Sequence, residues 1–306
     1  MSTHTAQPTE RPDPLRIWLM AARPRTLPAA VAPVLVGTAL AATEGTFHPL
    51  RFVAAMLGAL LIQVGTNLSN DYSDARRGAD TEDRLGPVRV TAGGLVPPRQ
   101  VLVATYVAFG LAVLVGVYLV VTAGWQLLLV GAASILAGVL YTGGPRPYGY
   151  EGLGDLFVFL FFGIVAVSGS YFAQTSHMEW EALVLSVPVG MLAAALLMVN
   201  NTRDLETDRR AGKRTIAVRL GRARARGIYA AEVYLAFFVA QIPWIAGAED
   251  LSPWLLLVFL ALPLAAPIVR TVRARTDGPS LNGALAKTGL LQLVFCVLLS
   301  AGILAS

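Results

Sequence analysis

Residues 52–74 read FVAAMLGALLIQVGTNLSNDYSD, an apolar run that ends in asparagine and aspartate. The 19 residues from 52 to 70 carry no charged side chain, and a helix needs about 20 mostly apolar residues to cross the hydrocarbon core of a bilayer. The segment therefore predicts a transmembrane helix whose carboxylates lie where the helix leaves the bilayer.

Comparable apolar segments lie on both sides of this run. Only 14% of the 306 residues are charged, whereas an average soluble domain is about 25% charged. The whole chain, 1–306, is expected to form a single membrane-embedded domain. We expect an all-α fold, a polytopic membrane bundle of nine transmembrane helices over residues 27–42, 52–70, 101–121, 125–141, 153–172, 183–201, 228–246, 251–269 and 284–305.

The basic residues give the bundle a direction. With the N-terminus in the cytosol, 23 of the 24 Lys and Arg residues fall on the cytosolic face, in loops or at helix ends, and Arg51 alone falls on the other face. The positive-inside rule thus predicts a cell-membrane protein with a cytosolic N-terminus and an external C-terminus. The basic excess reports this topology and not a nucleic-acid partner. The N-terminal segment 1–26 and the loops 71–100 and 202–227 are then cytosolic. The short outer loops carry Glu44, Glu179, Glu181, Glu249 and Asp250.

A polar cluster closes the quoted span on the cytosolic face. Asn67, Asn70, Asp71 and Asp74 follow the i, i+3, i+4, i+7 spacing, so all four share one helix face. Ionisable side chains at membrane depth are costly and usually functional. Taken alone, the cluster is consistent with a functional site and also with an ordinary polar helix end at the membrane interface.

A second cluster closes the sixth span on the same face. Asn200, Asp204 and Asp208 repeat at i+4, and Asn201 lies beside them. Asp71 and Asp204 are 133 positions apart (204 minus 71), so the chain reads as two four-helix repeats plus one added helix. Such a repeat would place the two carboxylate stripes opposite each other across a central cavity.

Facing carboxylates suit a hard cation. Mg²⁺ prefers oxygen ligands and commonly uses one or two carboxylates together with substrate phosphates. We therefore interpret Asp71, Asp74, Asp204 and Asp208 as catalytic metal ligands that hold a diphosphate through Mg²⁺. Ordinary polar helix ends at the membrane interface are the plainer alternative, but they do not explain two matching clusters.

Basic side chains near the clusters are candidate phosphate ligands. Arg84 and Lys213 each lie within ten residues of a carboxylate cluster. The glycine- and proline-rich turn 141–150 presents Arg146 flanked by tyrosines. We expect Arg146 to bind the diphosphate, and Tyr141 to hydrogen-bond the same group or to shield the cation.

Several stretches of the chain also occur in a known family. They are residues 22–28 (ARPRTLP), 70–74 (NDYSD), 83–89 (DRLGPVR), 141–144 (YTGG) and 200–204 (NNTRD). With them the chain resembles the UbiA superfamily of intramembrane prenyltransferases, and within it the 1,4-dihydroxy-2-naphthoate polyprenyltransferases of the MenA type. The resemblance implies nine helices, Mg²⁺ as cofactor, and a site that opens to the lipid bilayer.

The resemblance also assigns residues. Asp71 and Asp74 match the first metal-binding motif, and Asp204 and Asp208 match the second. Tyr141 matches the tyrosine of the superfamily's Tyr-x-x-x-Lys motif, but proline stands at position 145 in place of the lysine. The residues expected to bind substrate are Arg23, Asn67, Asn70, Arg84, Arg146, Asn200, Asn201 and Lys213.

The implied reaction joins a polyprenyl diphosphate to 1,4-dihydroxy-2-naphthoate with loss of CO₂ and diphosphate, and yields demethylmenaquinone after oxidation. Another aromatic acceptor, such as 4-hydroxybenzoate or homogentisate, is the alternative within the same class. A membrane transporter is the alternative from another class, although transporter sites lie near the bilayer midplane and these carboxylates lie at one face. A non-catalytic scaffold explains neither cluster.

Overall fold

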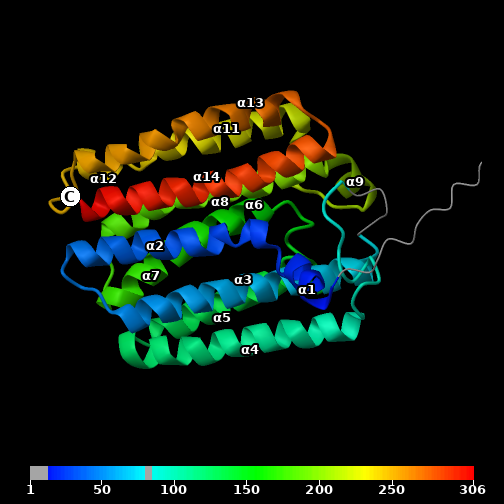
Figure 1. Cartoon of the computed structure of the whole chain (residues 1–306), viewed down its shortest axis with the longest axis horizontal. Coiled ribbons are helices and arrows are strands. Elements are labelled where there is room, and N and C mark those ends of the chain that lie inside the picture. The colour runs from blue at the N-terminus through cyan, green and yellow to red at the C-terminus, as the bar shows by residue number, and fades with distance from the viewer. Residues whose placement is uncertain (1–12, 80–84) are drawn as a thin grey trace, which may run out of the picture.

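The computed structural model describes residues 13–79 and 85–306, and every regular element in these ranges is a helix. Long helices run side by side along one axis, with α1 and α9 at one end of the bundle and the C-terminus at the other (Figure 1). The α-helices are α1 Pro14–Ala22, α2 Pro28–Thr43, α3 Pro49–Arg77, α4 Pro98–Ala123, α5 Gln126–Leu140, α6 Gly154–Phe159, α7 Ala166–Thr175, α8 Trp180–Arg203, α9 Leu205–Arg210, α10 Ile216–Leu220, α11 Arg222–Val239, α12 Ile242–Ile245, α13 Leu262–Ala274 and α14 Gly278–Leu304. Two 3₁₀ segments, η1 Pro24–Thr26 and η3 Pro253–Ala261, and one π-helical segment, η2 Leu160–Val165, complete the list.

The predicted all-α membrane bundle is confirmed, but its count of nine spans is not. In the described ranges, six helices are long and apolar enough to cross a membrane, and α1 with α2 makes a seventh if this pair, bent by 51°, counts as one span. The span predicted at 125–141 is the 15-residue helix α5. The one predicted at 228–246 is interrupted between α11 and α12, where Pro243 lacks the N–H that a continuous helix needs.

Two segments outside the predicted spans, the N-terminal segment 1–26 and the loop 202–227, contain helix. Residues 14–22 of the N-terminal segment form α1, and the 202–227 loop holds α9, α10 and the start of α11. Local capping explains α10, because the Thr215 side chain accepts a hydrogen bond from the Val218 N–H. These short helices are too polar or too brief to appear in a hydropathy pattern.

Helix α8 lies at the centre of the core. Its most apolar window is 72% buried, more than in any other spanning helix of the described ranges. It packs against α6, α11 and α14, and the largest fully buried aromatic side chains around it are Tyr171, Tyr229, Phe237 and Phe295. The motif at the end of α8 is therefore held by a rigid element.

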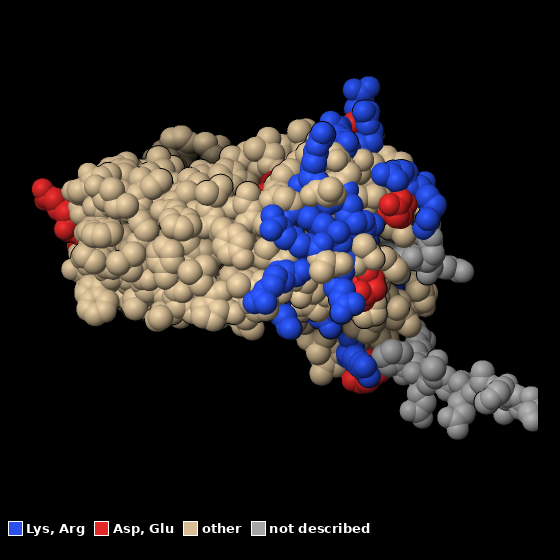
Figure 2. Space-filling view, turned by 90° about the horizontal axis from the view of Figure 1, so that it is seen from above, with Lys and Arg blue, Asp and Glu red and all other residues tan. Residues whose placement is uncertain are grey.

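Charge divides the surface as the sequence predicts. Figure 2 shows Lys and Arg gathered at one end of the molecule, a long uncharged surface beside them, and acidic side chains at the opposite tip. The polar ends of α3 and α8 both lie toward the basic end. The fold thus brings both carboxylate clusters to one face.

Candidate active site

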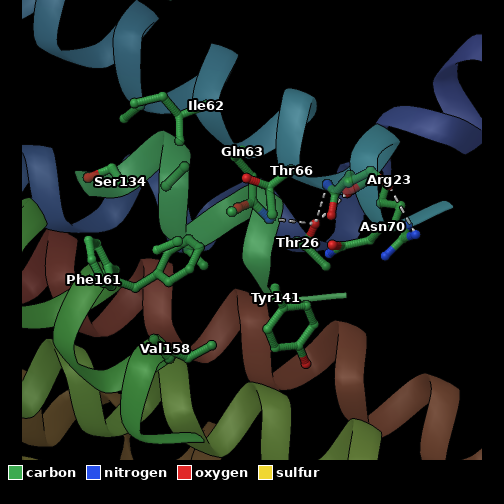
Figure 3. Close-up of a pocket in the computed structure, with 18 of the residues that line it drawn as sticks. Arg23, Thr26, Ile62, Gln63, Thr66, Asn70, Ser134, Tyr141, Val158 and Phe161 are labelled. Carbon is green, nitrogen blue, oxygen red and sulfur yellow. Dashed lines mark hydrogen bonds between the residues drawn. The ribbon is translucent and has the colours of Figure 1, made fainter. Parts of the chain in front are cut away.

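A cavity of about 810 Å³ begins at the basic end of the bundle and continues between the helices. Polar residues such as Arg23 and Asn70 lie at one end of it, and Ile62, Ser134 and Phe161 lie further in (Figure 3). The cavity wall includes eleven of the predicted site residues: Arg23, Asn67, Asn70, Asp71, Asp74, Tyr141, Asn200, Asn201, Asp204, Asp208 and Lys213.

In the first cluster, Asp71 organises the chain that follows α3. Its side chain is 1% exposed, and its two carboxylate oxygens accept hydrogen bonds from the N–H groups of Val90 (3.2 Å) and Thr91 (2.9 Å). Asn70 accepts a hydrogen bond from the Thr142 hydroxyl at 2.9 Å. The cluster therefore anchors two loops of the polar face.

Asn67 lies in the cavity wall and also holds the chain that precedes α2. Its Nδ2 donates to the carbonyl of Ala22 at 2.9 Å and to Oγ1 of Thr26 at 3.1 Å. Arg23, whose φ of 53° places it in the left-handed region, donates from Nη2 to the Asn67 carbonyl at 3.2 Å. These bonds fix the turn between α1 and α2 at the edge of the cavity.

The second cluster is not one uninterrupted helix, contrary to the prediction. Helix α8 ends at Arg203, and α9 starts after Asp204. Backbone bonds from Asp204 N to Asn200 O (3.0 Å) and from Asp208 N to Asp204 O (2.8 Å) nevertheless keep the three side chains on successive turns. The predicted stripe survives across a one-residue break.

A buried arginine, Arg203, pairs with Asp204 at the break between α8 and α9. Arg203 is 3% exposed and binds Asp204 through two bonds, Nε to Oδ1 at 2.8 Å and Nη2 to Oδ2 at 2.5 Å. Its Nη2 also donates to Asn200 Oδ1 at 2.8 Å. Asn201 points elsewhere and donates to Asp155 Oδ2 at 3.4 Å. Asp204 is thus a charge-paired carboxylate before any ligand binds.

The two clusters meet at Lys213. Its Nζ lies 3.6 Å from Asp74 Oδ2 and 4.0 Å from Asp208 Oδ1, and 4.7 Å from the centre of the Tyr150 ring. Asp74 also accepts a 2.6 Å hydrogen bond from the Tyr150 hydroxyl and has Arg89 Nη2 at 3.9 Å. One ammonium group therefore lies between carboxylates that are far apart in the sequence.

The donor chemistry of this face fits a hard cation. An ammonium group held between Asp74 and Asp208 shows that positive charge is favoured there. No three His, Cys, Asp or Glu side chains in the described ranges stand close enough together to hold a metal ion by themselves. Mg²⁺ needs only one or two protein carboxylates when substrate phosphates supply further oxygens.

One predicted cation, Arg146, does not join this group. Arg146 is exposed on the turn after α5 and is not part of the cavity wall. Its turn is pinned from outside, because Arg77 Nε donates to the carbonyl of Thr142 at 3.1 Å. Arg84 lies outside the described residues. Lys213 and Arg89 are the basic side chains beside Asp74.

Aromatic rings line one wall from the polar end inward. Tyr141 meets Tyr148 edge-on with ring centres 5.5 Å apart, Tyr148 stacks on Phe157 at 4.1 Å, and Phe157 lies 6.1 Å from Phe161. All four belong to the cavity wall. Burial raises the pKa of Tyr148, so its hydroxyl stays protonated and donates to the Ala137 carbonyl at 2.8 Å. The wall thus offers π faces and no charge.

Beyond these rings the cavity is apolar and deep. Along α3 its wall includes residues from Asp71 to Ala55, and the 16 helical steps between them (71 minus 55) correspond to about 24 Å of helix. That depth is most of the roughly 30 Å hydrocarbon core. The cavity therefore joins a charged end to a long apolar interior.

Some of these residues were missed from the sequence. Arg203 and Tyr150 were not singled out, although Arg203 directly precedes Asp204. Asp155 is buried near the start of an apolar span and could have been found by the rarity of charge in such spans. Of the aromatic wall, Tyr141 was predicted, but its stacking with Tyr148, Phe157 and Phe161 was not, because these residues come from different elements.

The comparisons with known proteins agree with this geometry. The model of the UbiA prenyltransferase family matches residues 30–302. The chain belongs to the UbiA prenyltransferase family. The family resemblance inferred from the sequence is therefore confirmed.

Two relatives of the chain are both named as 1,4-dihydroxy-2-naphthoate octaprenyltransferases. A 1,4-dihydroxy-2-naphthoate octaprenyltransferase of Mycobacterium tuberculosis is 41% identical over 288 residues, with 94% of this chain and 96% of the relative covered. One of Escherichia coli is 38% identical over 296 residues, with 94% and 95% covered. The chain is thus similar to these enzymes over nearly its full length.

The UbiA fold is also matched by solved structures. A UbiA homologue from Archaeoglobus fulgidus, bound to DMAPP and Mg²⁺, superposes with a TM-score of 0.68 at 14% identity and covers 94% of this chain and 99% of that chain. At this identity the likeness shows the fold alone.

Proposed function

We propose that this enzyme transfers a polyprenyl group from polyprenyl diphosphate to 1,4-dihydroxy-2-naphthoate. Diphosphate and the ring carboxylate, as CO₂, leave, and the product is a demethylmenaquinol that oxidises to demethylmenaquinone. The observation that carries the proposal is a single cavity that joins the two carboxylate clusters to an apolar interior. This cavity extends about 24 Å inward from Asp71. The names of the full-length relatives support the choice of naphthoate acceptor.

In this proposal the charged end holds the diphosphate. Asp71, Asp74, Asp204 and Asp208 supply the carboxylate oxygens for Mg²⁺, whose presence in the Archaeoglobus fulgidus homologue supports this cofactor. Bound Mg²⁺ would neutralise charge that develops on the departing diphosphate. Lys213, now between Asp74 and Asp208, is placed to turn to phosphate oxygens, together with Arg89.

In the same proposal, the apolar interior and the aromatic wall bind the prenyl chain and surround the reacting carbon. The apolar depth receives the prenyl tail, which stays out of water, as does the allylic cation that forms when diphosphate leaves. Tyr148 and Phe157, stacked at 4.1 Å, present ring faces near the charged end, where they favour positive charge. The electron-rich ring of the acceptor then attacks the allylic carbon.

The proposal is tested with purified protein in detergent and one prenyl diphosphate. We expect product of the mass of the prenylated, decarboxylated naphthol with 1,4-dihydroxy-2-naphthoate and Mg²⁺, and none in EDTA. Equal or better turnover with 4-hydroxybenzoate or homogentisate would reassign the acceptor. Absence of turnover with all three would refute prenyl transfer to these aromatic acceptors.

The cation assignment gives a first prediction. Lys213→Ala should lower kcat/KM for the prenyl diphosphate about tenfold to a hundredfold, since removal of a charged hydrogen bond costs about 1.5–3 kcal/mol. Arg146→Ala is the matched control and should stay within about twofold, because Arg146 is exposed outside the cavity. Steady-state kinetics with the donor varied measure both. The reverse order of effects would restore Arg146 as the diphosphate ligand.

We also propose that the basic end faces the cytosol of a cell membrane, which puts the site on the cytosolic side, the N-terminus inside and the C-terminus outside. The native Cys296 is buried, so single added cysteines report sidedness. An impermeant maleimide on intact cells should label Glu249→Cys, and Arg210→Cys only after permeabilisation. Labelling of Arg210→Cys in intact cells contradicts the orientation.

A further inference from the structure

Asn282, in the first turns of α14, makes two hydrogen bonds to parts of the site that come from different regions of the chain. Its Oδ1 accepts from Arg203 Nη1 at 2.7 Å. Its Nδ2 donates to the carbonyl of Leu85 at 2.9 Å. The residue is thus a bridge across 79 positions on one side and 197 on the other.

The Leu85 bond leads to the first cluster. Leu85 opens the segment 85–97, whose N–H groups at Val90 and Thr91 are bound by the Asp71 carboxylate. The same segment carries Arg89, 3.9 Å from Asp74. Contact between this segment and α14 is close, because a Cβ on Gly278 would lie 3.2 Å from Leu85 Cβ. The position of Leu85 therefore bears on both aspartates of the first cluster.

The Arg203 bond leads to the second cluster. The Arg203 guanidinium is buried and forks onto Asp204, with its remaining contacts to Asn200 and Asn282. A guanidinium that makes two parallel bonds to a carboxylate fixes the orientation of that carboxylate only if the guanidinium plane is itself fixed by other contacts. Asn282 provides that support from another helix.

We propose that Asn282 is a positioning residue that sets the spacing of the two carboxylate clusters, by tying the segment 85–97 to Arg203. The inference rests on the proposed function, since it concerns the geometry in which the prenyl diphosphate binds. Asn282 is part of the cavity wall, but both of its side-chain hydrogen bonds go to Leu85 and Arg203, through which it acts. Its loss should therefore weaken donor binding and leave acceptor binding nearly unchanged.

An amide is the group that this place requires. Its carbonyl oxygen accepts from the cationic Arg203, and its NH₂ donates to the Leu85 carbonyl. An ionised aspartate would accept from Arg203 but has no donor for Leu85. Asn282→Asp thus separates the two bonds with almost no change in size, and Asn282→Ala removes both.

The first readout is the split between the two substrates. We expect Asn282→Ala and Asn282→Asp to raise the KM for prenyl diphosphate about tenfold, because each variant loses at least one hydrogen bond that holds the site. The KM for 1,4-dihydroxy-2-naphthoate should change less than about twofold. Ser280→Ala is the matched control in the same turns of α14, because alanine keeps the backbone N–H that donates to Asp277 Oδ1 at 2.9 Å.

The second readout does not need activity. Val90 is fully buried within the segment 85–97, and the native Cys296 is also buried. A polar maleimide should label Val90→Cys at least about fivefold faster when Asn282→Ala or Asn282→Asp is added, and at the parent rate with Ser280→Ala. Farnesyl thiodiphosphate with Mg²⁺ should slow labelling in the parent and much less in the Asn282 variants.

The outcomes separate the two proposals. Parent-like labelling together with an unchanged donor KM in Asn282→Ala overturns the inference even if the parent enzyme transfers prenyl groups. An enzyme that transfers no prenyl group to the naphthoate refutes the proposed function, and the labelling rates then still decide whether Asn282 holds the segment. If Asn282→Ala fails to fold, Asn282→Asp carries both readouts.

Discussion

Asp208→Asn is expected to reduce kcat/KM by about a hundredfold or more while the protein stays folded. The substitution keeps the size of the side chain but removes a charged oxygen ligand, and metal stabilisation of a departing diphosphate is worth several kcal/mol, at about 1.36 kcal/mol for each tenfold in rate. Oδ1 of Asp208 lies 4.0 Å from Lys213 Nζ, which is longer than a hydrogen bond, whereas Asp204 accepts two short bonds from a buried arginine. The melting temperature should therefore fall less in Asp208→Asn than in Asp204→Asn.

Asp204→Asn should lose as much activity and also lose stability. Asp204 forms the two-bond pair with the buried Arg203, and removal of one partner of a buried pair costs about 3–5 kcal/mol. From the sequence alone, neutralising one of several clustered carboxylates would not be expected to destabilise the protein. The pair with Arg203 makes Asp204 an exception. Melting curves in detergent and steady-state kinetics on both variants make the comparison.

Glu206→Gln is the control for these two substitutions. Glu206 lies between Asp204 and Asp208 on α9, but its side chain is 56% exposed and pairs with Arg209 at the surface. Surface pairs of this kind contribute about 0–1 kcal/mol, so this variant should keep its activity and its melting temperature. Full activity in Asp208→Asn, or an unchanged melting temperature in Asp204→Asn, would contradict the roles given to these residues.

Gly163→Val is expected to prevent accumulation of folded protein or to destabilise it by several kcal/mol. A Cβ on Gly163 would lie 2.5 Å from the Gly190 Cα and 2.8 Å from the Ser186 carbonyl oxygen, and backbone atoms cannot move aside as a flexible side chain can. Overpacking of a dense core typically costs about 1–3 kcal/mol, and this contact is closer than usual. Activity should fall as well, because the π-helical segment η2 places Phe161 in the cavity wall.

Gly116→Ala is the matched control, since Gly116 also belongs to the cavity wall but a Cβ there has nothing within 4 Å. In a helix interior this change is neutral or stabilising by up to about 1 kcal/mol. Fluorescence-detected size exclusion after a temperature series measures folded protein for both. If a Gly163→Ala variant has the same melting temperature as the parent protein, the Gly163–Gly190 contact does not fix the π-helical segment.

Much of the candidate site was accessible from the sequence. The i, i+3, i+4, i+7 pattern of Asn67, Asn70, Asp71 and Asp74 located the first cluster, and the spacing of Asp204 and Asp208 located the second. Both patterns depend only on helical periodicity, which neighbouring residues in the chain fix. The structure brings both clusters to one cavity.

The partners of these residues were not accessible in the same way. Asn67 holds the turn at Ala22 and Thr26, 45 and 41 positions away, and so belongs to the framework of the site. Arg146 was expected at the diphosphate because it is the cation of a rigid turn, yet its side chain is exposed while Tyr141 and Tyr148 of the same turn line the cavity. In a sequence, a polar side chain that binds a ligand and one that binds a distant carbonyl look alike.

The sequence by itself determined that this protein is a helical membrane bundle with two carboxylate clusters and basic residues at one end. These properties follow from local hydropathy and helical spacing, and a bilayer leaves few other solutions because backbone polar groups in hydrocarbon must bond within the chain. Only the tertiary structure decided that Lys213 lies between Asp74 and Asp208, and that Asn282 joins Arg203 to Leu85. Such contacts depend on how helices far apart in the chain pack together, and packing is set by the shapes of many side chains at once.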